Sequence, residues 1–163
     1  MSSAQSIIQT SHLANMRALK AENSRLAAEN ASLKDEMASL RSHFDLALAV
    51  AAELQGGGEI ELWDGWNLLL GAVKAAKDRR ELIEQAKAHP VPVWIVFDGH
   101  DERVAVDGKV RVSYTGGDGA QRADRFICDY LRMARYLGFS DRVSVRTNDK
   151  KLAKEAAAIK ARR

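Results

Sequence analysis

The sequence predicts an α/β protein in which a long coiled-coil helix precedes a mainly parallel sheet domain with helices on both faces. Two observations carry this prediction: leucines repeat every seven residues in the first third of the chain, and short apolar runs alternate with amphipathic segments after it. Three consecutive glycines separate the two patterns. The predicted organisation is a coiled coil over residues 1–55, a flexible glycine linker over residues 56–58 and a sheet domain over residues 59–163.

The first segment has the spacing of a coiled coil. Its leucines keep one heptad position in phase, and no proline or glycine interrupts residues 1–55. With the leucines at the d position of the heptad, Asn23 and Asn30 fall at the a position. A buried asparagine at an a position favours a two-stranded coiled coil in fixed register. We therefore expect a parallel homodimer through residues 13–55; the alternative is a lone helix docked on its own domain. The heptad leucines are Leu19, Leu26, Leu33 and Leu40, and the expected interchain charge pairs are Glu29 with Lys34 and Glu36 with Arg41.

The end of this segment differs from the rest. Beyond Leu40, additional apolar residues such as Leu46, Leu48 and Val50 widen the stripe. A wider stripe suits packing against a globular core. The last turns of the helix are therefore candidates to pack on the sheet domain.

Composition favours a soluble, cytoplasmic protein. Hydrophobic residues make up 46% of the chain and charged residues 29%, and no apolar run approaches the ~18 residues that span a bilayer. The first residues lack the pattern of a signal peptide. Cys128 is the only cysteine, which excludes an internal disulfide and a cysteine-rich zinc site. We therefore expect no membrane association.

The second segment alternates strand and helix patterns, which predicts a mainly parallel sheet with right-handed crossovers. Asp107-Gly108 lies between two alternating runs and predicts a hairpin or one further strand. The expected strands are 59–63, the apolar run HPVPVWIVFDG at 89–99, the two arms of 102–115, and 142–147. The expected helices are 66–89, 123–139 and 148–163, and GGDGAQ at 116–121 is the expected loop.

Four aspartates fall where the predicted strands end or the helices begin. Asp64 ends the first strand, Asp98 ends the second, Asp124 opens a helix, and Asp149 follows the last strand. The carboxyl ends of parallel strands meet at one edge of a sheet, so these side chains should share that edge. Asn67 lies one helical turn after Asp64. Taken singly, each aspartate is also explained as a turn or N-cap residue.

Such a cluster favours metal-dependent phosphoryl chemistry. Neighbouring carboxylates repel one another unless a cation or a proton compensates. All-oxygen ligands suit Mg²⁺ or Mn²⁺, which activate water and polarise phosphoryl oxygens. We therefore expect hydrolysis of phosphodiester bonds, with Asp64, Asp98, Asp124 and Asp149 as metal ligands.

Four motifs in order resemble the NYN domains of the PIN-like nuclease superfamily, and in particular the YacP-like branch. They are LWDGWNLL, VWIVFDG, VRVSYTGGDGAQRADRFI and VSVRTND, spread over roughly a hundred residues from Glu59 to about Ala157. The resemblance implies a three-layer PIN-like (Rossmann-like) fold and a metal-dependent endoribonuclease acting on single-stranded RNA. By motif, the catalytic residues are Asp64, Asn67, Asp124 and Asp149.

The chain departs from the family pattern at three places. Trp66 replaces the usual tyrosine, Cys128 stands where many relatives carry a second acid one turn after Asp124, and Lys150-Lys151 follow Asp149 where some relatives carry a further acid. The reduced number of acids keeps open another function, that of a catalytically degenerate RNA-binding or adaptor protein. A phosphatase for small molecules on the same fold is a third reading.

Basic residues near the acidic edge are the candidates for RNA contacts. Residues 56–163 carry 20 lysines and arginines against 16 acids, a balance compatible with a polyanionic partner. The candidates are Arg103, Lys109, Arg111, Arg122, Arg125, Lys150 and Lys151, and a solvated surface is the alternative for all of them.

Overall fold

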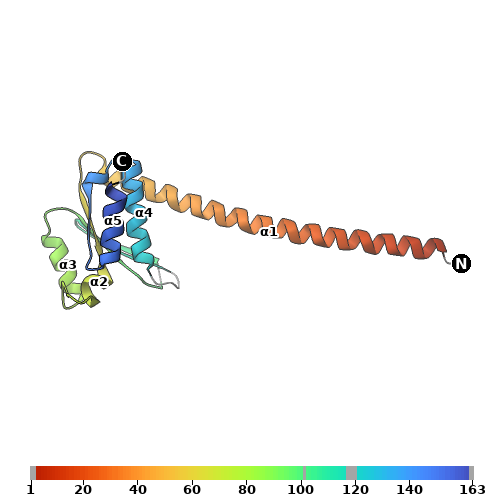
Figure 1. Ribbon diagram of the computed structural model, residues 1–163, viewed down its shortest axis with the longest axis horizontal. Helices are drawn as coiled ribbons and strands as arrows, with labels where there is room; N and C mark the ends of the chain where they lie inside the picture. Colours follow the sequence, from red (N-terminus) through yellow and green to blue (C-terminus); the bar gives the residue numbers. More distant parts are fainter. Residues whose placement is uncertain (1–2, 101, 117–120, 162–163) are drawn as a thin grey trace. The chain divides into compact units, whose positions relative to one another are not determined.

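The computed structural model describes residues 3–100, 102–116 and 121–161, so the centre of the expected GGDGAQ loop lies outside the described residues. The chain contains five α-helices, one 3-10 helix and five strands in these ranges (Figure 1). In order they are α1 Ser3–Leu54, β1 Ile60–Asp64, α2 Gly65–Leu70, α3 Arg79–Ala88, β2 Val93–Phe97, β3 Glu102–Asp107, β4 Val110–Thr115, α4 Arg122–Tyr136, η1 Ser140–Arg142, β5 Val143–Arg146 and α5 Lys150–Ala161.

The strands form one mainly parallel sheet, in the order β3-β4-β2-β1-β5. Strands β4, β2, β1 and β5 run parallel to one another, and only β3 is antiparallel to its neighbour. The predicted hairpin is confirmed, since Gly108 turns the chain between β3 and β4 with a φ of +61°. The mainly parallel α/β prediction is therefore confirmed.

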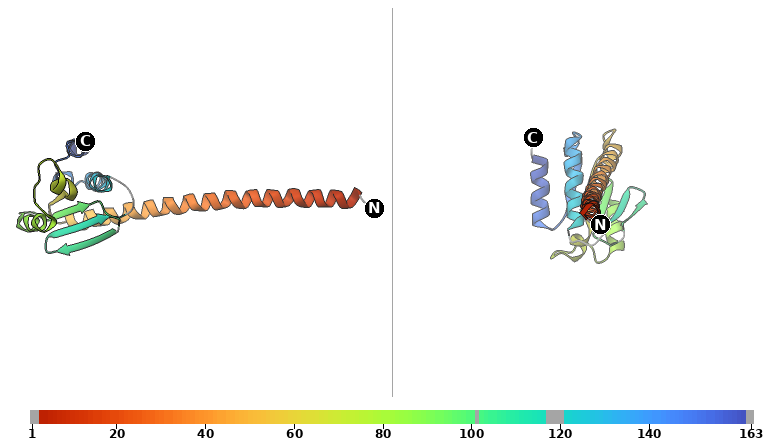
Figure 2. Two further views of the ribbon diagram at one scale, coloured as in Figure 1. Left: turned by 90° about the horizontal axis from the view of Figure 1, so that it is seen from below. Right: turned by 90° about the vertical axis from the view of Figure 1, so that its right-hand side faces the viewer.

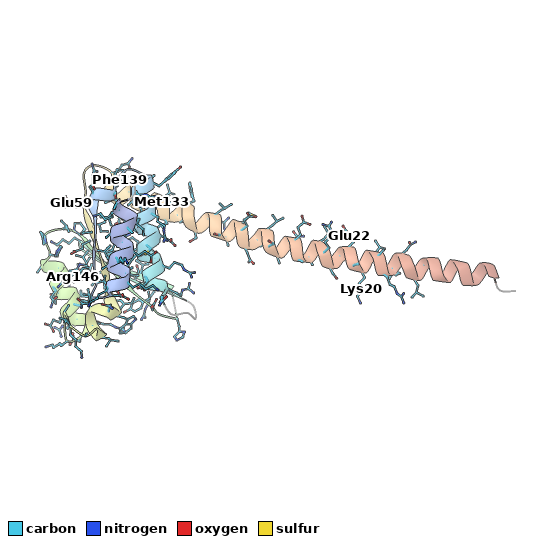
Figure 3. The ribbon with its side chains drawn as sticks, viewed as in Figure 1. Lys20, Glu22, Glu59, Met133, Phe139 and Arg146 are labelled. Carbon is cyan, nitrogen blue, oxygen red and sulfur yellow. The ribbon has the colours of Figure 1, made fainter. Side chains whose placement is uncertain are left out.

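Each face of the sheet has its own apolar core. On one face, α4 and α5 lie side by side over alternate strand residues such as Leu62 and Val96 (Figure 2). Met133 and Phe139 pack, partly buried, against the same cluster (Figure 3). On the other face, α2 and α3 cover the intervening residues, among them Trp63.

The segment expected as one helix over residues 66–89 is two helices, so that prediction is wrong. The first helix ends at Leu70, and Gly71 donates its N–H to Asn67 O (2.9 Å). The second begins after Asp78, whose carboxylate accepts from the N–H of Glu81 (2.9 Å). The helical spacing was real on both sides, but the N-cap and the glycine define separate helices. The eight residues between them form a surface segment, residues 71–78.

Helix α1 contributes to two compact units, Met1–Asp45 and Leu46–Arg163. In the first unit the heptad leucines are exposed; Leu19 is 62% exposed and Leu40 66%. In the second unit Val50 and Leu54 are fully buried in the apolar cluster that also contains residues of α4 and α5, as the wider apolar stripe predicted.

Within the described residues, no helix combines the length and apolar character of a transmembrane span.

Candidate active site

Strand alternation brings the strand-end aspartates to the same face of the sheet. Successive side chains of a strand point to opposite sides, so residues two apart share a face. Leu62 and Val96 lie beneath α4 and α5, and Asp64 and Asp98 follow each of them by two residues. A hydrogen bond from Ala123 N of α4 to Asp98 Oδ1 (2.6 Å) fixes the direction of Asp98. Both carboxylates therefore lie at the carboxyl edge, on the side of α4 and α5.

Asp64 is the central residue of this site. Its side chain is buried at 5% exposure, and both of its oxygens accept hydrogen bonds, from Asn67 N (3.3 Å) and from the Thr147 hydroxyl (2.9 Å). Burial, with smaller contributions from the charges of Asp124 and Asp149, raises the pKa of Asp64 to about 6, although both hydrogen bonds favour the charged form. Asp64 is thus a carboxylate that titrates close to neutral pH.

Asp124 and Asp149 approach Asp64 from the starts of two helices. Asp124 lies in the first turn of α4, where burial, followed by the charges of Asp149 and Asp98, raises its pKa. Asp149 caps α5, since its Oδ1 accepts from Lys151 N (2.6 Å) and Leu152 N (3.3 Å). All four predicted aspartates therefore belong to one electrostatic cluster.

Asn67 positions the main chain around Asp64. Its N–H binds Asp64, and its side-chain oxygen accepts from Asn148 N (2.8 Å). The Asn148 side chain in turn donates to Val73 O (2.6 Å) in the 71–78 segment. Asn67 therefore links α2 to the turn before α5, and its side-chain oxygen is already bonded in this arrangement.

A pocket between α4 and α5 adds a residue that the sequence did not reveal. The pocket has a volume of about 250 Å³ and is lined by Asp124, Cys128, Glu155 and several cations. Glu155 raises the pKa of Asp124 and, after burial, that of the Cys128 thiol, which rises to about 12. Cys128 therefore remains a neutral thiol, and Glu155 is the additional acid near Asp124. One signal could have revealed it, since Glu155 lies on the face of α5 that carries Leu152 and Ile159 toward α4.

The site fits a divalent cation only in part. Repulsion among Asp64, Asp124 and Asp149 is what a bound cation would relieve. Across the part of the chain that the structure describes, no three His, Cys, Asp or Glu side chains converge closely enough to hold a metal ion. Mg²⁺ commonly retains several waters and uses one or two carboxylates directly. The residues therefore fit a cation held partly through water, and they do not form a cage of three direct ligands.

The predicted RNA-binding cations divide between the two ends of the sheet. Lys109 lies in the β3–β4 turn and donates to His89 O, and Arg111 pairs with Glu53 and lies 4.4 Å over the Trp94 ring. Both are at the amino end instead of beside the acids, because β4 begins at Val110, level with Val93 of β2. The remaining candidates lie toward the carboxyl end: Arg103, Arg122, Arg125, Lys150 and Lys151.

The fold and the site define an α/β protein with a cluster of carboxylates at the carboxyl edge of a mainly parallel sheet. No protein-family model, curated protein or solved structure matches the chain.

Proposed function

We propose that this protein is a Mg²⁺- or Mn²⁺-dependent endoribonuclease that cleaves single-stranded RNA, with the three-layer fold of the PIN-like, YacP-type NYN domains. The observation that carries the proposal is the cluster of Asp64, Asp124 and Asp149 at the edge where ligands bind in parallel sheets. Burial, together with neighbouring carboxylates, raises the pKa of Asp64 and of Asp124 there. Helices on both faces and the order of the motifs support the fold assignment.

Each side chain has a defined part in the proposed reaction. Asp64, Asp124 and Asp149 would hold the cation, partly through water, and Asp98 anchors α4 beside them through Ala123 N. A cation held there would supply Lewis acidity toward a phosphodiester oxygen and would activate water. Thr147 and Asn67 keep both oxygens of Asp64 oriented. Arg125 and Lys151, beside Asp124 in the pocket, favour the approach of a phosphate.

The test is cleavage of single-stranded RNA with Mn²⁺ by the parent and by Asp64→Asn. We expect at least about a 100-fold loss of rate, the range over which a positioned catalytic group acts. Asp141→Asn is the matched control, because Asp141 is an exposed acid of η1. Equal cleavage by Asp64→Asn and the parent means that the site assignment is wrong.

A second candidate function is a non-catalytic RNA-binding or adaptor protein. It is favoured by the lack of three convergent metal ligands in the described residues and by the neutral thiol of Cys128 beside Asp124. Calorimetry with Mn²⁺ separates the two. Binding of RNA with neither Mn²⁺ binding nor cleavage supports the adaptor and contradicts the nuclease.

We also propose that α1 pairs two copies of the chain as a parallel coiled coil over residues 13–55. The heptad side chains Leu26 and Leu33 are 42% and 51% exposed and have the spacing of a two-stranded seam. Light scattering of the full chain should give twice its 18.0 kDa mass, and Leu26→Asp with Leu33→Asp should give the single mass. A parent of single-chain mass at high concentration contradicts the pairing.

A further inference from the structure

An arginine–aromatic cluster lies on the opposite face of the strand ends that carry the acids. Phe97 and Tyr114 stack with ring centroids 5.3 Å apart and an interplanar angle of 17°. Trp66 meets Phe97 edge to face at 5.2 Å. Phe97 is fully buried, while Trp66 and Tyr114 are half-buried, so two of the three rings reach the surface.

Two arginines lie over these rings. The guanidinium of Arg79 is 4.4 Å from the Trp66 centroid and donates to the Tyr114 hydroxyl (3.1 Å). The guanidinium of Arg103 is 4.3 Å from the Tyr114 centroid. Both arginines are exposed, and neither forms an ion pair with a carboxylate among the side chains that the structure describes. A planar guanidinium held on an aromatic ring leaves its outer side available for stacking.

The cluster is joined directly to the acidic site. The indole N–H of Trp66 donates to Asp98 O (2.7 Å), and Phe97 immediately precedes Asp98. Trp66 is two residues after Asp64, with Gly65 between them. A Cβ at Gly65 would lie 2.3 Å from the Phe97 ring, so only glycine permits this close approach. The carboxylates and the rings therefore lie at the same edge of the sheet, on its two opposite faces.

The surface beside the cluster is basic. Lys74, Lys77, Arg79 and Arg80 lie within seven residues that include one acid, Asp78. Asp78 caps α3 through Glu81 N, and Glu81 accepts from Lys77 N (3.0 Å), so both nearby carboxylates bind the main chain. The local field therefore attracts a polyanion.

We propose that the side chains of Arg79, Trp66, Tyr114 and Arg103 form a subsite that stacks a base of single-stranded RNA next to the carboxylate site. Arginine planes and aromatic rings are the surfaces on which unpaired bases stack, while cations hold the adjoining phosphates. The inference rests on the proposed function for its choice of RNA. It adds a base-binding surface on the face of the sheet away from α4 and α5.

The test compares binding of a short labelled oligouridylate with binding of an abasic ribose-phosphate strand of equal length. Fluorescence anisotropy of the full chain is measured in EDTA at fixed salt, so that cleavage plays no part. We expect the strand with bases to bind about tenfold more tightly. Arg79→Lys should remove most of that difference, because lysine keeps the charge and loses the plane.

Arg80→Lys is the matched control, since Arg80 is the exposed neighbour of Arg79 on α3 and should keep the full preference for bases. The inference is overturned if both strands bind equally, if the parent binds neither, or if Arg79→Lys keeps the preference. A separate cleavage assay with Mn²⁺ tests the nuclease proposal. Failure of the base-stacking inference is therefore distinguished from failure of the nuclease proposal.

Discussion

Charged side chains have different neighbours at the two ends of the sheet. At the amino end, Arg111 pairs with Glu53, and His89 lies 3.1 Å from Glu61. At the carboxyl end, burial and then the charges of neighbouring acids raise the pKa values of Asp64 and Asp124. At the amino end the carboxylate of Glu53 has a cationic partner, whereas at the carboxyl end acids lie beside other acids, with Arg125 and Lys151 nearby. The amino end therefore serves stability, and the carboxyl end stores an unfavourable interaction that a cation or a proton can relieve.

The largest expected effect is at the amino end, from Arg111→Met. Burial raises the pKa of Glu53 even with Arg111 beside it, so removing the guanidinium leaves a carboxylate that is poorly solvated. We expect the free energy of unfolding to fall by about 2 kcal/mol, measured by urea titration. Arg103→Met, which removes an arginine lying over a ring at the other end, should lower it by less than about 1 kcal/mol. Equal losses would contradict the contrast between the ends.

A smaller effect of opposite sign is expected from Asp64→Asn. The folded protein holds the proton of Asp64 up to about pH 6, well above the ordinary pKa of 3.8, so ionisation of Asp64 lowers stability as the pH rises from about 4 to about 6. At pH 7.5 the variant should be more stable by about 1–2 kcal/mol, after allowance for its weaker hydrogen bond to Thr147. Below pH 4 this gain should disappear. A parent that is more stable than the variant at pH 7.5 would show that ionisation of Asp64 does not destabilise the folded protein.

The smallest effect is the response to a divalent cation. Mn²⁺ at several times its dissociation constant should stabilise the parent by about 1 kcal/mol, a rise in Tm of about 3 °C. The rise should vanish in Asp64→Asn, and in the parent at pH 5, where Asp64 is protonated. Asp141→Asn should respond as the parent does. The same rise in Asp64→Asn would place cation binding elsewhere.

The spacing of apolar residues predicted most of the strands and helices of the fold. The apolar run at Val93–Phe97 and the Asp107-Gly108 turn predicted a buried strand and a hairpin, and both are present. The helix over residues 66–89 was wrong because apolar spacing continued across a break that Gly71 and Asp78 define. That error hid the basic 71–78 segment and the position of Arg79 over Trp66.

The site was predictable where strand order determines it. Asp64, Asp98, Asp124 and Asp149 come together because each follows a parallel strand or begins a helix at that edge. Apolar spacing places Glu155 on the face of α5 that packs toward α4, but its approach to Asp124 and Cys128 depends on how the two helices lie against each other. The location of Arg111 depends on strand length, since β4 begins only one residue before it.

The Thr147 hydroxyl connects the carboxylate of Asp64 to the main chain at the start of α5. It accepts the N–H of Asp149 (3.0 Å) and contacts Asp64 Oδ2, so its single hydrogen is left for the carboxylate. The hydroxyl is thus polarised in one direction, from the amide at the start of α5 toward the end of β1. Serine would preserve this relay and valine would break it at both ends, so the identity of one side-chain atom connects the protonation of Asp64 to the geometry of the neighbouring turn.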